Sequence, residues 1–219
     1  MKISDIAVNY INHCGSDLSV VDAARVSFNK VSELVNGELS SADVKLINYL
    51  AKHKHTSPFN HCFLTVRVKA PIFVARQLVK HKFMPYNETS RRYVTDEPEF
   101  YFPDVWRGKA DNVKQGSSNE PVMLPLSKYI DTIKESLANY EEALEFGCCA
   151  EQARMLLPQN TMTDWVWSGT LGAFCDMLNL RLDSHTQYET RVVAEKISDI
   201  VKNCFPVSHK ALLESKDSQ

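Results

Sequence analysis

The stretch CFLTVRVKAPIFVARQLVKH, residues 62–81, decides the fold class of this 219-residue chain. Apolar and polar residues alternate over residues 62–69, a pattern that predicts a strand with one buried face. Pro71 then stands where a helix can begin, because the first turn of a helix does not need the backbone N–H that proline lacks. We therefore predict a helix over Ile72 to His81, directly after the strand, in a chain that mixes both kinds of element.

Outward from this stretch the pattern is mostly helical. We predict a strand over residues 3–12, helices over 20–28, 40–52, 126–144, 148–157 and 163–204, and a loop over 95–121. In the helix over 126–144 apolar residues recur every three or four positions, and Gly147 can end it. Repeated strand–helix–strand units are absent, which argues against a doubly wound sheet. We expect an α+β fold, rich in helix, in a single domain over residues 1–219.

Composition excludes several classes of protein. Hydrophobic residues make up 44% of the chain and charged residues 24%, and the formal net charge is −2. A chain this close to neutral is not expected to bind nucleic acid or anionic lipid with its whole surface, although a local basic pocket is compatible with it. No apolar run is long enough to span a membrane, and the first residues lack the apolar core of a signal peptide. We expect a cytoplasmic protein, in the host cytoplasm if the source is a virus.

Six cysteines are present, and no two are spaced as CxxC. A chain of this size does not need a disulfide framework, so we expect reduced thiols. The adjacent pair Cys148-Cys149 lies in a helix-like stretch, and we interpret it as a packing feature rather than a redox pair.

Two polar clusters lie near the central stretch. His53, His55 and His61 fall within nine residues and offer nitrogen ligands for a metal, but their spacing matches neither a helical i,i+4 pair nor a zinc finger. Surface or hydrogen-bonding histidines are the alternative. The second cluster, from Arg76 to Tyr93, combines cations, hydroxyls and one carboxylate around two apolar side chains. It suits a phosphorylated planar ligand, and equally a solvated basic helix end.

Two further clusters lie toward the C-terminus. Glu151 and Arg154 are three residues apart, so a surface salt pair is the default interpretation. If residues 180–191 are helical, Arg181, His185 and Glu189 line one face, which indicates either a buried polar site or a solvated face. The GxGxxG, P-loop, GxSxG and HExxH motifs are absent. Any nucleotide must therefore be bound by another architecture.

Taken together and in order, these clusters resemble the flavin-dependent thymidylate synthase family. That family carries a signature of Arg-His-Arg, seven residues and Ser, matched here by Lys80-His81-Lys82 and Ser90. Further blocks that resemble the family are DAARVS (22–27), HTSPFNH (55–61), ARQ (75–77), YNETSRRY (86–93), ARMLLP (153–158), NLR (179–181) and QYE (187–189). The resemblance extends over roughly residues 5–205.

The resemblance implies an enzyme that makes dTMP from dUMP. In the family, methylenetetrahydrofolate supplies the one-carbon unit, reduced FAD supplies the hydride, and NADPH recharges the flavin. The implied fold is α+β with a small, mainly antiparallel sheet, in a homotetramer whose sites lie between subunits. The implied partners are small nucleotide and folate molecules, with no nucleic acid, no membrane and no metal.

The resemblance also implies site residues, position by position. The implied dUMP contacts are Gln77, Glu88, Ser90, Arg92, Arg154 and Arg181. The implied FAD contacts are Ser27, His55, Ser57, Asn60, Lys80, His81, Lys82, Phe83 and Asp176. Arg181 and Ser90 are the implied catalytic-site residues: a cation near the pyrimidine carbonyl stabilises negative charge that develops on the ring, and the serine binds substrate. None of the six cysteines needs to be catalytic.

The chain departs from the family on the flavin side. Lys80 and Lys82 replace arginines and keep the charge but not the planar fork. Pro85 stands where serine is usual, Asn60 where glutamate is common, and Thr170 and Gly172 where asparagine and arginine are frequent. We expect dUMP binding to be kept and flavin affinity or reductant preference to be altered.

Three alternatives stay open. The first is an enzyme of the same fold with a different product or substrate, such as a pyrimidine nucleotide hydroxymethylase or an enzyme of dCMP. The second is a nucleotide-binding protein without flavin chemistry. The third is a metal-dependent hydrolase built on His53, His55, His61 and His81.

Overall fold

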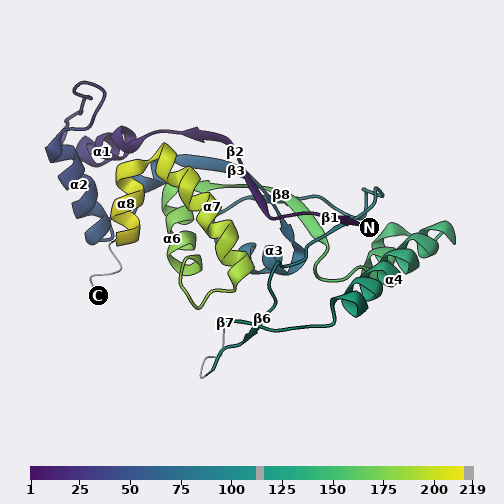
Figure 1. The fold of residues 1–219 in the computed structure, drawn as a ribbon. Coiled ribbons are helices and arrows are strands. Elements are labelled where there is room, and N and C mark those ends of the chain that lie inside the picture. Colours follow the sequence, from purple (N-terminus) through teal and green to yellow (C-terminus); the bar gives the residue numbers. More distant parts are fainter. Residues whose placement is uncertain (112–115, 215–219) are drawn as a thin grey trace.

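A four-stranded antiparallel sheet organises the computed structural model of this chain, which describes residues 1–111 and 116–214 (Figure 1). Its strands, in spatial order, are β2 (Ala7–Cys14), β3 (Phe63–Pro71), β8 (Met162–Thr170) and β4 (Tyr86–Glu88). Two short pairs lie outside it: β1 (Lys2–Ile3) runs parallel to β5 (Glu99–Phe100), and β6 (Arg107–Lys109) runs antiparallel to β7 (Ser117–Pro121).

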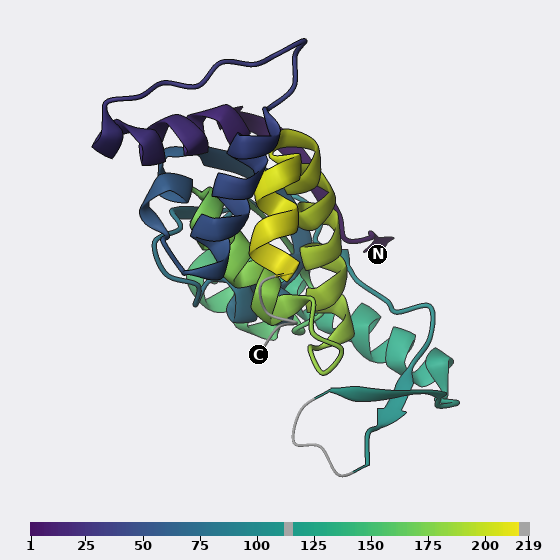
Figure 2. The same ribbon diagram turned by 90° about the vertical axis from the view of Figure 1, so that its left-hand side faces the viewer.

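Helices cover one face of this sheet. The layer contains α6 (Leu171–Arg181), α7 (Tyr188–Cys204) and α8 (Pro206–Glu214), and α1 (Asp17–Arg25) and α2 (Ser41–Lys52) continue it at one end. Figure 2 shows α8 lying between α2 and α7. Buried residues of β3 and of these helices form the main core, which includes Leu64, Val66, Phe174 and Ile197. The expected helix-rich α+β fold with a small, mainly antiparallel sheet is confirmed.

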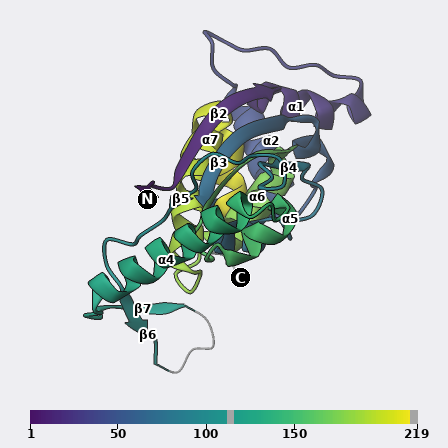
Figure 3. The same cartoon turned by 90° about the vertical axis from the view of Figure 1, so that its right-hand side faces the viewer.

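A second, smaller core lies under α4 (Leu126–Glu145), which Figure 1 shows apart from the main helical layer. Figure 3 shows the β6–β7 hairpin below α4. Ile133, Leu137 and Tyr140 of α4 pack there against Phe100 of β5 and Ala153 of α5 (Ala150–Ala153). Since the chain contains two separate clusters of buried residues, the single domain over residues 1–219 stays a prediction. Among the described residues no helix combines the length and apolarity needed to cross a membrane.

Several local predictions are confirmed. The predicted inner face of β3 is buried, with Leu64, Val66 and Val68 at most 1% exposed. Ser40 caps α2, because its hydroxyl accepts a hydrogen bond from the backbone N–H of Asp43 at 3.2 Å. Gly147 follows the end of α4 with φ +82°, a conformation that glycine adopts without steric cost.

The predicted helical stretch over residues 163–204 is wrong at its start. Met162–Thr170 instead forms β8, which pairs with β3 on one side and β4 on the other. Thr163, Trp165 and Trp167 are buried, whereas Val166 between the two tryptophans is exposed. Alternating β-branched and aromatic residues indicate a strand here. The sequence prediction instead followed the apolar stripe of the next helix.

Three other predictions need correction. The helix after Pro71 is shorter than predicted: α3 (Ile72–Leu78) ends before Lys80, and the N–H of His81 closes a turn onto the carbonyl of Leu78. Residues 182–187 leave the helix between α6 and α7, so Arg181, His185 and Glu189 do not line one helical face. In its described part, the predicted loop over 95–121 contains β5, β6 and β7.

Candidate active site

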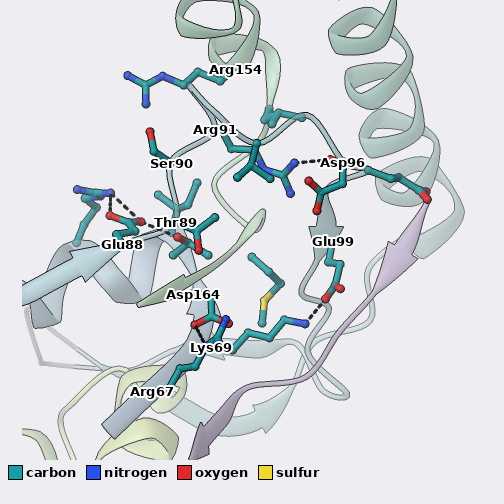
Figure 4. Close-up of a pocket in the computed structure, with 17 residues that line it drawn as sticks. Arg67, Lys69, Glu88, Thr89, Ser90, Arg91, Asp96, Glu99, Arg154 and Asp164 are labelled. Atoms are coloured by element: carbon teal, nitrogen blue, oxygen red, sulfur yellow. Dashed lines mark hydrogen bonds and ion pairs between the residues drawn. The ribbon is translucent and has the colours of Figure 1, made fainter. Parts of the chain in front are cut away.

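A polar pocket of about 680 Å³ opens beside β4, and we call it the β4 pocket. Glu88 comes from β4, Ser90 from the turn after it, and Arg154 from η3 (Arg154–Leu156). All three are expected dUMP contacts. Figure 4 shows Ser90 and Arg154 extending to the same side of the pocket, with Arg67, Lys69 and Asp164 of β3 and β8 at the opposite end.

Most charges of the β4 pocket are held in ion pairs. Arg67 Nε donates to Asp164 at 2.8 Å, and one guanidinium nitrogen of Arg76 donates to both oxygens of Glu88 at 2.9 and 3.2 Å. The hydroxyl of Thr163 also donates to Glu88, at 2.7 Å. These contacts hold the Glu88 carboxylate in one orientation, with its charge already balanced.

Arg154 is different. Its Nε donates to the backbone carbonyl of Glu151 at 3.2 Å, and among the described residues it has no carboxylate partner within 4 Å. The Glu151 carboxylate instead pairs with Arg92, 2.7 Å from its Nε. The predicted Glu151–Arg154 salt pair is therefore wrong, and Glu151 links two expected dUMP contacts. A guanidinium without a carboxylate, beside the Ser90 hydroxyl, suits a phosphate group.

A second polar pocket, of about 740 Å³, lies at the C-terminal end of α6, and we call it the α6 pocket. It is lined by Gln77 and Arg181, both expected dUMP contacts, and by Lys80, an expected FAD contact. Arg181 Nε donates to Nε2 of His81 at 3.0 Å, and its NH2 group lies 3.5 Å from the backbone carbonyl of Gln77.

The contact with Arg181 fixes the state of His81. A guanidinium only donates hydrogen bonds, so Nε2 of His81 must accept, and the neutral ring carries its proton on Nδ1. Burial, together with the charge of Arg181, lowers the pKa of His81 to about 4. Burial also lowers the pKa of Arg181 from its ordinary 12.5. Arg181 stays a cation, and its neighbour His81 is uncharged at neutral pH.

The two pockets divide the expected dUMP contacts between them. Glu88, Ser90 and Arg154 line the β4 pocket, Gln77 and Arg181 line the α6 pocket, and Arg92 is exposed outside both. The neighbours Arg76 and Gln77 on α3 open into different pockets. One chain therefore does not gather these residues into one cavity.

The expected FAD contacts are more dispersed. His81 is partly buried against Arg181, and Lys82 and Phe83 are exposed just beyond it. Phe83 has φ +62° and a side chain that is 88% exposed, an unusual backbone state for a bulky residue. Four further expected contacts are exposed and lie outside both pockets: Ser27 in η1 (Val26–Phe28), His55, Ser57 in η2 (Ser57–His61) and Asp176 in α6.

Three of the departures from the family form one cluster. The hydroxyl of Thr170 donates to Oδ1 of Asn60 at 2.8 Å and accepts from the N–H of Ala173 at 3.2 Å, which caps α6. A Cβ atom on Gly172 would lie only 2.6 Å from the same Asn60 oxygen. Asn60 thus occupies space that a side chain at position 172 would need.

The described residues give little support to a metal-dependent hydrolase. Within residues 1–111 and 116–214 no three His, Cys, Asp or Glu side chains converge as metal ligands. His53 and His55 instead lie against Tyr49, with ring centroids 4.2 and 6.1 Å from it.

Comparison with known proteins assigns the family. Residues 9–207 match the thymidylate synthase complementing protein family. The chain belongs to this family. It is 39% identical over 207 residues to the flavin-dependent thymidylate synthase of Thermotoga neapolitana. The alignment covers 94% of this chain and 90% of the relative. The enzyme of the same name from Thermosipho africanus is 37% identical over 208 residues, covering 93% of this chain and 89% of the relative.

The fold of this family member matches that of PolB from Streptomyces cacaoi, a UMP/dUMP methylase. Its structure with 5-Br dUMP superposes with a TM-score of 0.84 at 31% identity and covers 96% of each chain. Its structure with 5-Br UMP also gives a TM-score of 0.84, at 29% identity, and covers 97% of this chain and 95% of PolB. The resemblance read from the signature is thus confirmed at the level of family and fold.

Some residues of the β4 pocket were not expected from the family blocks. Arg67 and Lys69 lie on the polar face of β3, which the alternation over residues 62–69 had indicated. Thr163 and Asp164 reach the pocket from β8. The alternating pattern around Trp165 and Trp167 indicates the strand that carries Thr163 and Asp164. The helix predicted over this segment did not place these two residues at the pocket.

Proposed function

We propose that this chain is a flavin-dependent thymidylate synthase that methylates dUMP to dTMP. The observation that carries the proposal is the convergence on the β4 pocket of Glu88 and Ser90, from one segment, with Arg154, from a distant part of the sequence (Figure 4). The names of the relatives from Thermotoga neapolitana and Thermosipho africanus, and the dUMP analogue bound to PolB, support the same substrate.

The β4 pocket would bind the nucleotide by its phosphate. Arg154 has guanidinium N–H groups beyond the one bound to the Glu151 carbonyl, and a planar guanidinium recognises phosphate oxygens in pairs. Ser90 adds a hydroxyl donor, and Arg92 lies nearby on the Glu151 carboxylate. Glu88, held by Arg76 and Thr163, presents a fixed acceptor to the rest of the nucleotide.

The α6 pocket would act on the pyrimidine ring. Methylation at a pyrimidine carbon requires negative charge to develop on the ring, and a preorganised cation near its carbonyl stabilises that charge. Arg181 is suited to this role because its neighbour His81 is neutral and only accepts a hydrogen bond from it. The guanidinium is thus held in place without losing its net charge.

A complete site would then need two chains. The β4 pocket of one subunit would face the α6 pocket of another, which explains why one chain divides the dUMP contacts between two cavities. We propose the homotetramer implied by the family resemblance, with each site built between subunits.

The residues on the flavin side fit an FAD cofactor. Lys80 and Lys82 supply exposed cations for a diphosphate, and Phe83 offers an exposed ring to a flat ligand. When bound, FAD supplies the hydride; methylenetetrahydrofolate would be the carbon donor and NADPH the reductant. In the cluster of Asn60, Thr170 and Gly172, the Asn60 side chain would have to move to admit an arginine at position 172. We therefore propose a flavin contact that differs from that of arginine-bearing relatives.

The test is dTMP formation from dUMP by the purified chain with methylenetetrahydrofolate, FAD and NADPH. The proposal expects dTMP with all components present, none when FAD is left out of cofactor-stripped protein, and none with Arg181→Ala. A hydroxymethylated product, identified by its mass, would favour the hydroxymethylase alternative. No product and no flavin retained by the protein would overturn the proposal.

A second candidate substrate is UMP. PolB, whose fold matches this chain, is a UMP/dUMP methylase with structures bound to both kinds of 5-bromo nucleotide. Comparing kcat/KM for UMP and dUMP decides between them: our proposal expects dUMP to be preferred, and equal values would assign the broader specificity to this chain.

A further inference from the structure

We propose that Glu189, held by Arg107, is a positioning residue that fixes which end of the Gln77 side-chain amide faces the α6 pocket. This inference rests on the proposed function, in which Gln77 contacts dUMP. It concerns residues at the start of α7 that play no part in the nucleotide contacts described above.

A chain of side-chain hydrogen bonds runs from Arg107 to Gln77. Arg107 NH2 donates to Oε1 of Glu189 at 2.6 Å, and Nε2 of Gln187 donates to the other oxygen of Glu189 at 3.2 Å. Nε2 of Gln77 donates to Oε1 of Gln187. The hydroxyl of Thr190 completes the chain by donating to Oε1 of Gln77 at 3.2 Å.

The carboxylate sets the polarity of this chain. An amide can present either its oxygen or its nitrogen to a neighbour, but an ionised carboxylate only accepts hydrogen bonds. Glu189 therefore selects Nε2 of Gln187, which turns the Gln187 oxygen toward Gln77. That oxygen in turn selects Nε2 of Gln77, and the Gln77 oxygen is left to accept from Thr190.

Burial makes this selection effective. Glu189 is 5% exposed and Thr190 is fully buried, so few water molecules can substitute for a lost partner. Arg107 is itself fixed, since its Nε donates to Ser117 at 2.9 Å and its guanidinium carbon lies 4.3 Å from the centre of the Tyr188 ring. In such a buried place, turning an amide so that its oxygen faces the Glu189 carboxylate would leave polar groups without partners, which costs free energy.

The fixed polarity determines what Gln77 can offer a ligand. A glutamine amide has two N–H groups and two oxygen lone pairs, and the chain uses one of each. Gln77 is left with one N–H on the nitrogen side and one lone pair on the oxygen side, in a fixed arrangement. A flipped amide would exchange their positions and lose the match to a nucleotide's donors and acceptors.

Glu189→Gln tests the inference because it keeps the shape of the side chain but no longer dictates a donor. We expect the Kd and KM for dUMP to rise about tenfold, with kcat within about twofold, since one hydrogen bond to the ligand is mismatched. Thr190→Val, which removes the hydroxyl at constant shape, should act in the same direction. Thr190→Ser, which restores it, should return dUMP affinity to near the wild-type value.

A double-mutant cycle with Gln77→Ala shows whether the effect passes through Gln77. We expect Glu189→Gln to weaken dUMP binding in the wild-type background and to add nothing once Gln77 is alanine. An equal effect in both backgrounds would overturn the inference, as would loss of affinity in Thr190→Ser equal to that in Thr190→Val.

The two proposals fail in different ways. If Gln77→Ala leaves dUMP affinity unchanged while wild-type protein makes dTMP, the positioning inference is wrong and the proposed function stands. If wild-type protein binds no dUMP, the proposed function is wrong. The inferred polarity is then judged by nuclear magnetic resonance of the Gln77 side-chain amide, which Glu189→Gln and Thr190→Val should both shift and Thr190→Ser should not.

Discussion

The β4 pocket and the α6 pocket handle positive charge in opposite ways. In the β4 pocket Arg67 and Arg76 each face a carboxylate, and Arg154 at the rim is held by a backbone carbonyl. In the α6 pocket Arg181 is held by a neutral imidazole, that of His81. The first arrangement positions groups rigidly with little net charge. The second keeps a guanidinium fixed without a carboxylate within 4 Å among the described residues.

This difference suggests a division of labour. A site that binds a phosphate needs only a local cation in addition to a neutral scaffold, and Arg154 is such a cation in the β4 pocket. A site that stabilises charge developing during a reaction needs a cation that no neighbouring anion neutralises, because its effect depends on the field at the reacting ring. We therefore expect loss of Arg181 in the α6 pocket to affect turnover and loss of Arg154 in the β4 pocket to affect affinity.

The largest expected effect is that of Arg181→Ala. It removes the cation that we propose stabilises charge on the ring, so kcat for dTMP formation should fall by roughly 10²–10³-fold, while the Kd for dUMP changes much less. Arg181→Lys is the matched control: it keeps the charge but loses the bond geometry to His81, and should recover part of the rate. A loss confined to KM would remove the proposed distinction between the pockets.

Arg154→Ala should come next, with the opposite signature. Loss of a charge-assisted hydrogen bond to the phosphate should raise the Kd for dUMP by roughly 10–100-fold, with a smaller change in kcat at saturating dUMP. Arg67→Ala sharpens the comparison within the same pocket, because Arg67 is paired with Asp164; its effect on Kd should stay below about threefold. Titration of dUMP into each variant measures this, and equal effects would contradict the account.

Gly172→Arg tests the cluster that separates this chain from arginine-bearing relatives. Any side chain at this position meets Asn60 Oδ1, 2.6 Å from the Cβ position. Because Asn60 is exposed and can turn away, overpacking should lower the free energy of unfolding by no more than about 1 kcal/mol. Asn60→Ala in the same chain removes the obstacle and should restore most of it. Urea denaturation of the single and double variants decides, and a fully stable Gly172→Arg would show that Asn60 gives way freely.

A further expected effect is on pH dependence and comes from His81. Burial and Arg181 lower its pKa to about 4, below the value of about 6.5 expected in an unfolded chain. The unfolded state then binds more protons between these values, so this contribution to stability is complete above about pH 6.5 and is lost as the pH falls toward 4. His81→Gln keeps an acceptor for Arg181 without titrating.

Unfolding free energies at pH 7 and pH 4.5 measure this contribution. The loss between the two pH values should be smaller in His81→Gln than in the wild type. An identical loss would show that His81 does not contribute to the acid sensitivity.

Local sequence patterns predicted much of the scaffold. Alternation over residues 62–69 predicted β3 and its buried face, and Ser40 and Gly147 marked the beginning of α2 and the end of α4 correctly. These features depend on neighbours within a few residues, which the sequence displays directly. By contrast, β8 is stabilised by pairing with β3 and β4, which are distant in the sequence. Its alternation of buried and exposed residues is short, and the longer helical pattern after it led to the wrong prediction.

The candidate site shows the same division between features set by local sequence and features set by tertiary structure. The blocks around Lys80-His81-Lys82 and Ser90 predicted nucleotide and flavin contacts, but not the residues with which these side chains pair. Arg67 meets Asp164 only through the register of β3 with β8, and Arg92 meets Glu151 across 58 intervening positions of the chain. Such pairings depend on tertiary structure, as does the division of the dUMP contacts between two pockets.

The most direct test of the central claim is to mix these two variants and assay them at a dUMP concentration far below the Kd of Arg154→Ala, where each variant alone makes little dTMP. Arg154→Ala damages the β4 pocket and Arg181→Ala the α6 pocket; if each site combines these pockets from different subunits, mixed oligomers regain intact sites. Co-expression should then restore dTMP formation at roughly a quarter of the wild-type sites for random pairing of the two chains across a two-fold interface. A mixture no more active than either variant alone would contradict a site shared between subunits.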